Sequence, residues 1–277
     1  MFLKVRNIAF VVFICFVLFY FFYEKNNGGA SVDDLREDVP ESWQKLSNKR
    51  IFFGHQSVGY NIIDGIRQLL DENPQIQLEI LEKKEVLNIL PGQLRHFKIG
   101  TNEDPESKTK DFAKILEPAN QKGVVDVAFH KYCYIDFNKD TDIEKVFSNY
   151  KKQMDWMKSK YQHVRFVHFT VPLTAIQRGP KAWVKKILGK PVGGMATNIK
   201  RNQFNLKLLE AYDGIDPIFD LARVQSTRPD GSLVYFTEKN KRYLSLYDGY
   251  SDDGGHLNKR GQKNVASRLL TFLAGVE

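Results

Sequence analysis

The 277-residue sequence contains only two cysteines, Cys15 and Cys133, and Cys15 lies inside a long apolar run near the N-terminus. A disulfide within the polar remainder of the chain is therefore excluded. The six histidines are scattered, with no His-x-x-x-His spacing, and there is no Cys-x-x-Cys pair. We therefore expect no metal site. Repeats, low-complexity tracts and nucleic-acid recognition motifs are also missing, so nucleic acid is not an expected partner.

Acidic residues are the minority charge, with 33 Asp and Glu against 41 Lys and Arg, which gives a formal net charge of +8. This balance favours an anionic partner such as an acidic polysaccharide or an anionic membrane surface. Much of the excess lies between residues 177 and 207, a stretch that also contains Trp183 and the sequence Pro-Val-Gly-Gly at 191–194. Such a segment could be a lid or substrate-binding loop carrying Trp183, or simply a solvated basic face.

The one long apolar run covers residues 8–23, which are 16 apolar or aromatic residues preceded by Lys4 and Arg6. Its length lies between that of a signal-peptide core and that of a membrane-spanning helix. We predict a signal anchor or signal peptide at residues 1–30, with an uncleaved membrane anchor favoured, and a polar tether at 31–48. The basic flank places the remaining chain outside the cytoplasm, periplasmic or extracellular, and secreted if the segment is cleaved.

From residue 49 to 277 the sequence has the length of a single domain and alternates short apolar runs with helical periodicity. The pattern predicts strands at 51–53, 76–81, 124–129, 164–170 and 218–221, and helices at 60–70, 108–116, 143–160, 198–211 and after 258. Strands separated by helices indicate an α/β fold, a three-layer α/β/α sandwich around a central, mostly parallel sheet. In such sheets ligands bind at the carboxyl ends of the strands.

The run Asp253-Gly-Gly-His256-Leu-Asn-x-x-Gly261 near the C-terminus carries the strongest chemical signal. It puts a carboxylate and an imidazole three residues apart on one short loop, which suits a general base and the group that orients it. A purely structural alternative exists, because Asp-Gly-Gly is common turn chemistry and could only close a loop before the last helix.

The hydroxyl best placed for such a base is that of Ser57, which follows an apolar strand and the turn residue Gly54 and precedes a helical run. This order presents the side chain at the carboxyl end of a strand and sets its backbone N–H at a helix N-terminus, where negative charge is favoured. Alone, Ser57 would be a helix cap. Together with the C-terminal run it predicts a nucleophile, with Cys133 the weaker candidate for that role.

A serine after the first strand, combined with Asp-x-x-His-Leu-Asn-x-x-Gly near the end, resembles the SGNH, or GDSL-type, family of serine hydrolases over roughly residues 50–275. The resemblance implies the flavodoxin-like fold of that family, with Ser57 as nucleophile, His256 as base and Asp253 as orienting acid. The first block departs from Gly-Asp-Ser and reads Gly-His-Gln-Ser, which puts His55 beside the turn as a substrate contact or a supporting hydrogen-bonding group.

The resemblance also implies an oxyanion hole formed by the N–H groups of Ser57 and Gly100, with Gly92 as a rival to Gly100. The asparagine of the family's third block has no counterpart between residues 124 and 136. A substitute donor is needed, and Asn102, Lys131 and Tyr132 are candidates, with Tyr132 also a candidate substrate contact.

The resemblance implies a serine esterase that, like members of that family, removes O-acyl groups, above all O-acetyl groups, from a carbohydrate or a related small substrate, and the N-terminal run predicts that it is exported. Two alternatives stay open. An O-acyltransferase could use the same residues to acylate an extracellular polysaccharide, and a degenerate hydrolase scaffold could serve as a non-catalytic glycan-binding or assembly protein.

Overall fold

The computed structural model describes residues 40–119 and 124–277, and the predicted N-terminal anchor lies outside them. Within those two ranges no helix combines the length and apolarity that crossing a bilayer requires. The compact unit begins at Pro40 with the 3₁₀ helix η2 (Glu41–Asn48). Trp43 and Leu46 of η2 are buried, and the Trp43 Nε1–H donates to Thr271 Oγ1 at 3.0 Å. The predicted tether at 31–48 therefore extends too far, because residues 41–48 form η2, which belongs to the domain.

Six parallel strands form the central sheet, which has the order β2 (Glu79–Glu82), β3 (Gln93–Lys98), β1 (Arg50–His55), β4 (Val127–His130), β5 (Arg165–Phe169), β6 (Ile218–Phe219). Apart from the edge strand β2, this is the flavodoxin-like order, in which the chain reverses its direction across the sheet between β1 and β4. The predicted fold class is confirmed. The carboxyl ends of β1 and β4 are consequently the expected place for a site.

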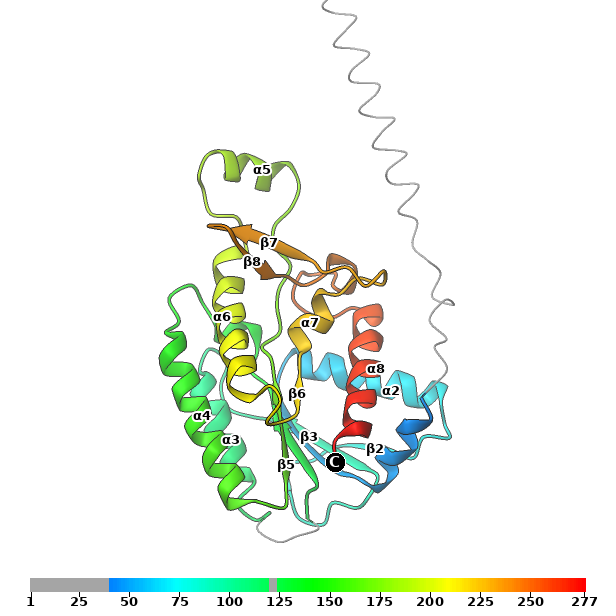
Figure 1. The fold of residues 1–277 in the computed structure, drawn as a ribbon. Helices are drawn as coiled ribbons and strands as arrows, with labels where there is room; N and C mark the ends of the chain where they lie inside the picture. Colours follow the sequence, from blue (N-terminus) through cyan, green and yellow to red (C-terminus); the bar gives the residue numbers. More distant parts are fainter. Residues whose placement is uncertain (1–39, 120–123) are drawn as a thin grey trace, which may run out of the picture. The chain divides into compact units, whose positions relative to one another are not determined.

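Helices cover both faces of the sheet (Figure 1). One face carries α2 (Val58–Glu72) and α8 (Lys259–Gly275), and the other carries α3 (Pro105–Ile115), α4 (Ile143–Lys160) and α6 (Met195–Tyr212). The connection from β5 to α6 contains the short helix α5 (Pro180–Ile187). After β6 the chain forms α7 (Leu221–Ser226) and a hairpin of β7 (Tyr235–Glu238) and β8 (Lys241–Leu244).

Helices α2 and α8 approach each other closely at Gly65. A Cβ atom at this position would lie only 2.3 Å from the carbonyl oxygen of Gln262 in α8. Glycine therefore sets the separation of the two helices. This contact brings the start of α8, and the loop before it, against the start of α2.

Four of the described histidines are buried, and His130 and His168 are the two on the side of the sheet that α3, α4 and α6 cover. His130 shares a hydrogen bond of 3.0 Å with Thr109 Oγ1, and the ring of His168 stacks on that of Tyr212 with centroids 3.7 Å apart. Burial is the main cause that lowers the pKa of His130 to about 3 and that of His168 to about 4. Both rings are therefore neutral in the native protein at neutral pH.

This burial predicts acid sensitivity. An unfolded chain protonates these histidines near pH 6.5, whereas the native state does not, so their contribution to stability is complete above about pH 7 and is lost as the pH falls towards 4. We expect the free energy of unfolding to drop by about 2–3 kcal/mol per histidine between pH 7 and pH 4. Urea denaturation across this range measures the drop, and His168→Gln should flatten its slope. A free energy of unfolding that stays constant from pH 7 to 4.5 would contradict the prediction.

Candidate active site

Ser57 lies in the turn between β1 and α2, at the carboxyl end of the central strand. Its backbone has φ 52° and ψ −115°, a conformation that residues with a Cβ atom seldom adopt. The Ser57 hydroxyl makes no capping hydrogen bond to α2. Instead its Oγ lies 2.9 Å from Nε2 of His256. The role as a simple helix cap is therefore wrong, and the strained turn directs the hydroxyl to the imidazole.

The loop before α8 holds His256 through Asp253. Asp253 Oδ2 lies 2.7 Å from His256 Nδ1, while its Oδ1 accepts from the backbone N–H groups of Gly255 at 2.8 Å and His256 at 2.7 Å. The hydrogen bond from the His256 side chain, followed by those two amides, holds the pKa of Asp253 well below its usual range. An ionised Asp253 requires Nδ1 to be the donor, so Nε2 of neutral His256 is free to accept from Ser57.

One carboxylate thus combines both functions that the sequence left as alternatives. Its Oδ1 closes the Asp-Gly-Gly turn, and its Oδ2 orients the imidazole.

The rest of the C-terminal run fixes this loop against the two helices. The N–H of Leu257 donates to Asn61 Oδ1 of α2 at 3.1 Å, and Asn258 caps α8 by accepting from the N–H of Gly261 at 3.0 Å. A Cβ atom at Gly261 would lie 2.5 Å from the carbonyl oxygen of Tyr250. The Leu257 side chain is also buried, so the leucine, the asparagine and the glycine of Leu-Asn-x-x-Gly each have a structural reason to follow His256.

Tyr134 is a site residue that the sequence did not indicate. It begins the 3₁₀ helix η3 (Tyr134–Asp136) after β4, and its ring meets that of His256 edge-on, with centroids 5.7 Å apart. Burial and then the charge of Asp253 raise the pKa of Tyr134, while the Ser57 side chain partly offsets them. Gly255 provides the space, since a Cβ atom there would lie 3.0 Å from the Tyr134 hydroxyl. Tyr134 thus places a protonated hydroxyl beside the loop that carries His256.

The predicted backbone donors differ in the structure. No acceptor among the described residues takes the N–H of Ser57, which lies at the N-terminus of α2. The N–H of Gly100 instead donates to Asp111 Oδ2 at 3.0 Å, and that of the rival Gly92 donates to the carbonyl oxygen of Lys49 at 3.0 Å. Both glycine amides are already engaged, so assigning either to an oxyanion hole is wrong for this structure.

The predicted side-chain donors are also differently placed. Lys131 is fully buried, with Nζ 3.3 Å from the carbonyl oxygen of Tyr132 and 3.6 Å from Cys133 Sγ, and burial lowers its pKa. Lys131 therefore contacts the segment after β4 from inside the core and is not accessible to a ligand. The prediction that Lys131 donates to the oxyanion is wrong for this structure. Asn102 is exposed, and its Oδ1 accepts from Lys108 Nζ at 3.1 Å, so only its NH₂ group can donate to a ligand.

Two of the three predicted substrate contacts are buried. His55 lies beneath α2 with Nε2 3.1 Å from His96 Nδ1, in space left by Gly59, where a Cβ atom would be 2.3 Å from the imidazole. The Tyr132 hydroxyl shares a 2.6 Å hydrogen bond with Thr109 Oγ1. Both residues support the site from within the core, so the prediction of direct substrate contact is wrong for them. Trp183 is exposed on α5, in a segment that extends from the body (Figure 1).

A buried ion pair joins the loops on either side of the site. Lys108 Nζ lies 2.7 Å from both carboxylate oxygens of Asp136, and both side chains are fully buried. Asp136 also accepts from the N–H groups of Glu103 at 2.9 Å and Cys133 at 2.7 Å. The pair therefore connects α3 and the loop after β3 with the segment after β4 that carries Tyr134.

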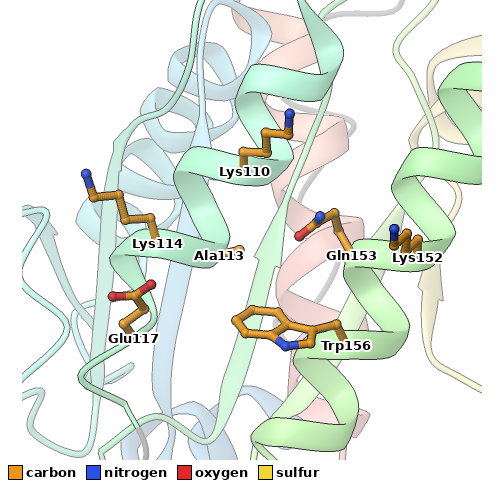
Figure 2. Close-up of a pocket in the computed structure, with 7 residues that line it drawn as sticks. All are labelled: Lys110, Ala113, Lys114, Glu117, Lys152, Gln153 and Trp156. Carbon is orange, nitrogen blue, oxygen red and sulfur yellow. The ribbon is translucent and has the colours of Figure 1, made fainter.

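A separate groove of about 390 Å³ lies between α3 and α4 (Figure 2). It is lined by Lys110, Ala113, Lys114, Glu117, Lys152, Gln153 and Trp156. The groove shares no residue with the Ser57 site. It offers lysines and an indole face to a ligand but no activated nucleophile.

No protein-family model and no curated protein sequence matches the chain. Solved structures of similar backbone include a GDSL-like lipase from Bacteroides thetaiotaomicron, with 12% identity, a TM-score of 0.48 and coverage of 92% of this chain and 94% of that one. A lipolytic protein of the G-D-S-L family from Veillonella parvula has 12% identity, a TM-score of 0.47 and coverage of 82% and 98%. The acetyl xylan esterase AlAXEase has 16% identity, a TM-score of 0.45 and coverage of 80% and 97%. These values describe a backbone likeness and transfer no activity to this chain.

The ion pair generates a stability prediction. Lys108→Met leaves the Asp136 carboxylate buried without its cation, and we expect a loss of about 3–5 kcal/mol in the free energy of unfolding. Lys110→Met on the same helix is the matched control, because Lys110 forms only an exposed pair with Glu106 and should leave stability nearly unchanged. Equal urea midpoints for the two variants would show that the buried pair does not hold the loops together.

Proposed function

We propose that the protein is a serine esterase of the SGNH type that removes O-acyl groups from a carbohydrate or a related small substrate. The observation that carries the proposal is the continuous hydrogen-bonded chain from Ser57 through His256 to Asp253, with 2.9 Å and 2.7 Å between the paired atoms. The strained backbone of Ser57 adds support, since positive φ at a strand-to-helix turn is how hydrolases present a nucleophile.

In the proposed first step, Ser57 Oγ attacks the carbonyl carbon of the ester while His256 Nε2 takes the hydroxyl proton. The carbonyl oxygen becomes an oxyanion near the N-terminus of α2. There the Ser57 N–H and the Tyr134 hydroxyl are the proposed donors, with the NH₂ group of Asn102 a third candidate. Asp253 stabilises the imidazolium that forms on His256.

Collapse of the tetrahedral intermediate breaks the ester C–O bond, and the imidazolium of His256 returns its proton to the leaving alcohol. A water molecule then attacks the acyl-serine and gives its proton to His256. The second collapse releases the carboxylic acid and restores the Ser57 hydroxyl. No step needs a metal ion or an organic cofactor.

The exposure of the site favours hydrolysis and admits a polymeric carbohydrate as well as a small substrate. The His256 and Asp253 side chains are 45% and 58% exposed, so a polymer chain can approach them and water can reach an acyl-enzyme. An O-acyltransferase needs to exclude that water, and this openness favours the esterase. The contact between Ser57 and His256 likewise favours catalysis over a non-catalytic scaffold. We further propose that the domain works outside the cytoplasm, anchored through the N-terminal run.

Removing the nucleophile should abolish the reaction. We expect Ser57→Ala and His256→Ala to lower kcat by about 10³-fold or more, and Asp253→Asn by a smaller but large factor, because the three residues act as one unit. The full-length chain is assayed for hydrolysis of aryl acetates and for acetate release from acetylated glycans, with Ser159→Ala on α4 as the control serine. If the wild type is no faster than Ser57→Ala on every acyl donor, the protein is not a serine esterase.

Tyr134 offers a test of the oxyanion assignment. Tyr134→Phe keeps the ring against His256 but removes the hydroxyl, so we expect kcat to fall about 10- to 100-fold with little change in KM. Steady-state kinetics on an aryl acetate separates the two parameters. Should kcat stay at the wild-type value, Tyr134 acts only through packing, and the second donor must be sought in Asn102.

A further inference from the structure

Helix α5 presents apolar side chains that the Ser57 chemistry does not explain. It lies within the connection from β5 to α6 and extends from the body of the domain (Figure 1). Four large apolar residues in and just after α5 are exposed: Trp183 at 66%, Val184 at 46%, Ile187 at 62% and Leu188 at 60%. Soluble domains seldom leave so many large apolar side chains together in water, which indicates a surface for interaction.

The four side chains form one continuous strip along the helix. Residues three and four apart share a helix face, and the hydrogen bond of 3.0 Å from the Leu188 N–H to the Val184 carbonyl oxygen extends the helical turn to Leu188. Ala182, by contrast, is buried. Helix α5 is therefore amphipathic, with its larger apolar face away from the protein.

The charged residues of the segment itself are all basic. Residues 178–190 contain Arg178, Lys181, Lys185, Lys186 and Lys190, and the sequence has no Asp or Glu between Asp155 and Glu210. Two of these basic residues have partners in the protein. Arg178 pairs with Asp248 at 3.1 Å, and Lys185 Nζ donates to Gln177 Oε1 at 2.7 Å.

An apolar strip edged by lysines matches the boundary between the headgroups and acyl chains of an anionic bilayer. There the apolar side chains leave water while the ammonium groups meet phosphates, and an indole is favoured at that depth. A soluble acidic polysaccharide would satisfy the lysines but leave Trp183, Ile187 and Leu188 in water. The combination of charge and apolar surface therefore favours lipid.

We propose that α5 and its flanks, residues 179–190, dock on the surface of a bilayer rich in anionic phospholipid, with Trp183 and Ile187 at the acyl boundary. This contact is separate from the predicted N-terminal anchor and independent of the esterase chemistry. It makes α5 a second attachment between the domain and the membrane.

Tryptophan fluorescence tests the proposal in the full-length chain, because the sequence has only three tryptophans, Trp43, Trp156 and Trp183. In Trp156→Phe, the exposed reporter is Trp183, since Trp43 is buried. The protein is reconstituted with vesicles of phosphatidylcholine, with and without phosphatidylglycerol, that carry brominated acyl chains. We expect the Trp183 emission to shift to shorter wavelength and to be quenched in the anionic vesicles, and less so in the neutral ones.

The matched control is Trp183→Phe, which leaves Trp156, a half-exposed indole on α4, as the reporter and should show neither effect. Lys181→Glu with Lys190→Glu, in the Trp156→Phe background, should remove most of the quenching while the thermal unfolding midpoint stays unchanged, because both side chains are exposed. The N-terminal segment is present in every variant, so the differences report on α5.

Two outcomes overturn the proposal. One is a Trp183 emission in anionic vesicles that keeps the wavelength of a solvent-exposed indole and is not quenched. The other is a shift that appears with soluble alginate but not with vesicles, which would assign the surface to an acidic polysaccharide.

Discussion

The close contact between α2 and α8 is the constraint on which the candidate site depends. Ser57 lies at the start of α2, and the loop that carries Asp253 and His256 leads into the start of α8. Ser57 and His256 are 199 positions apart in the sequence. Gly65 lets the two helices pack so closely that any side chain at this position would collide with the backbone of Gln262. The hydrogen bond from Leu257 to Asn61 then aligns the two starts. The 2.9 Å contact of Ser57 with His256 is thus a product of helix packing as much as of local sequence.

Beneath that contact, polar groups replace the usual apolar filling of a core. Gln56 Nε2 donates to the carbonyl oxygens of Ile99 at 2.5 Å and Gly100 at 2.8 Å, which ties the turn after β1 to the loop after β3. The Lys108–Asp136 pair ties that loop to the segment after β4. Three loops from three neighbouring strands therefore form one connected unit. Since a buried polar group is costly when its partner is lost, the unit is rigid, and its members cannot move independently.

The sequence predicted the architecture well because most elements follow simple periodicity. The helix at 143–160 and the strand at Val164–Thr170 match α4 and β5 almost residue by residue. Strand β3 was missed because Arg95 and His96 interrupt its apolar pattern, although both are buried. The two terminal nitrogens of the Arg95 guanidinium donate to the carbonyl oxygens of Glu85, Leu87 and Asn88, a loop arrangement that sequence spacing does not reveal. The short helices α5 and α7 and the β7–β8 hairpin were missed as well.

For the site, the local sequence pattern predicted that Ser57, His256 and Asp253 lie together. It did not predict which hydrogen-bond donors are available for an oxyanion beside them. Whether a backbone N–H is free depends on a distant acceptor such as Asp111 for Gly100, and no motif encodes that. Tyr134 differs from Tyr132 by two positions in sequence, yet the ring of Tyr134 meets that of His256 while the Tyr132 hydroxyl shares a hydrogen bond with Thr109 in the core. The direction of a side chain after a strand ends depends on the following turn, here η3, and not on strand alternation.

The positive φ of Ser57 has a consequence for the evolution of such a protein. At φ 52°, a glycine would fit with less strain than any residue that carries a Cβ atom. A lineage that no longer needed the hydroxyl would gain stability by exchanging Ser57 for glycine, so the fold itself favours loss of the serine. Retention of serine at this one position among relatives of this chain is therefore a sign of selection for chemistry that runs against selection for stability.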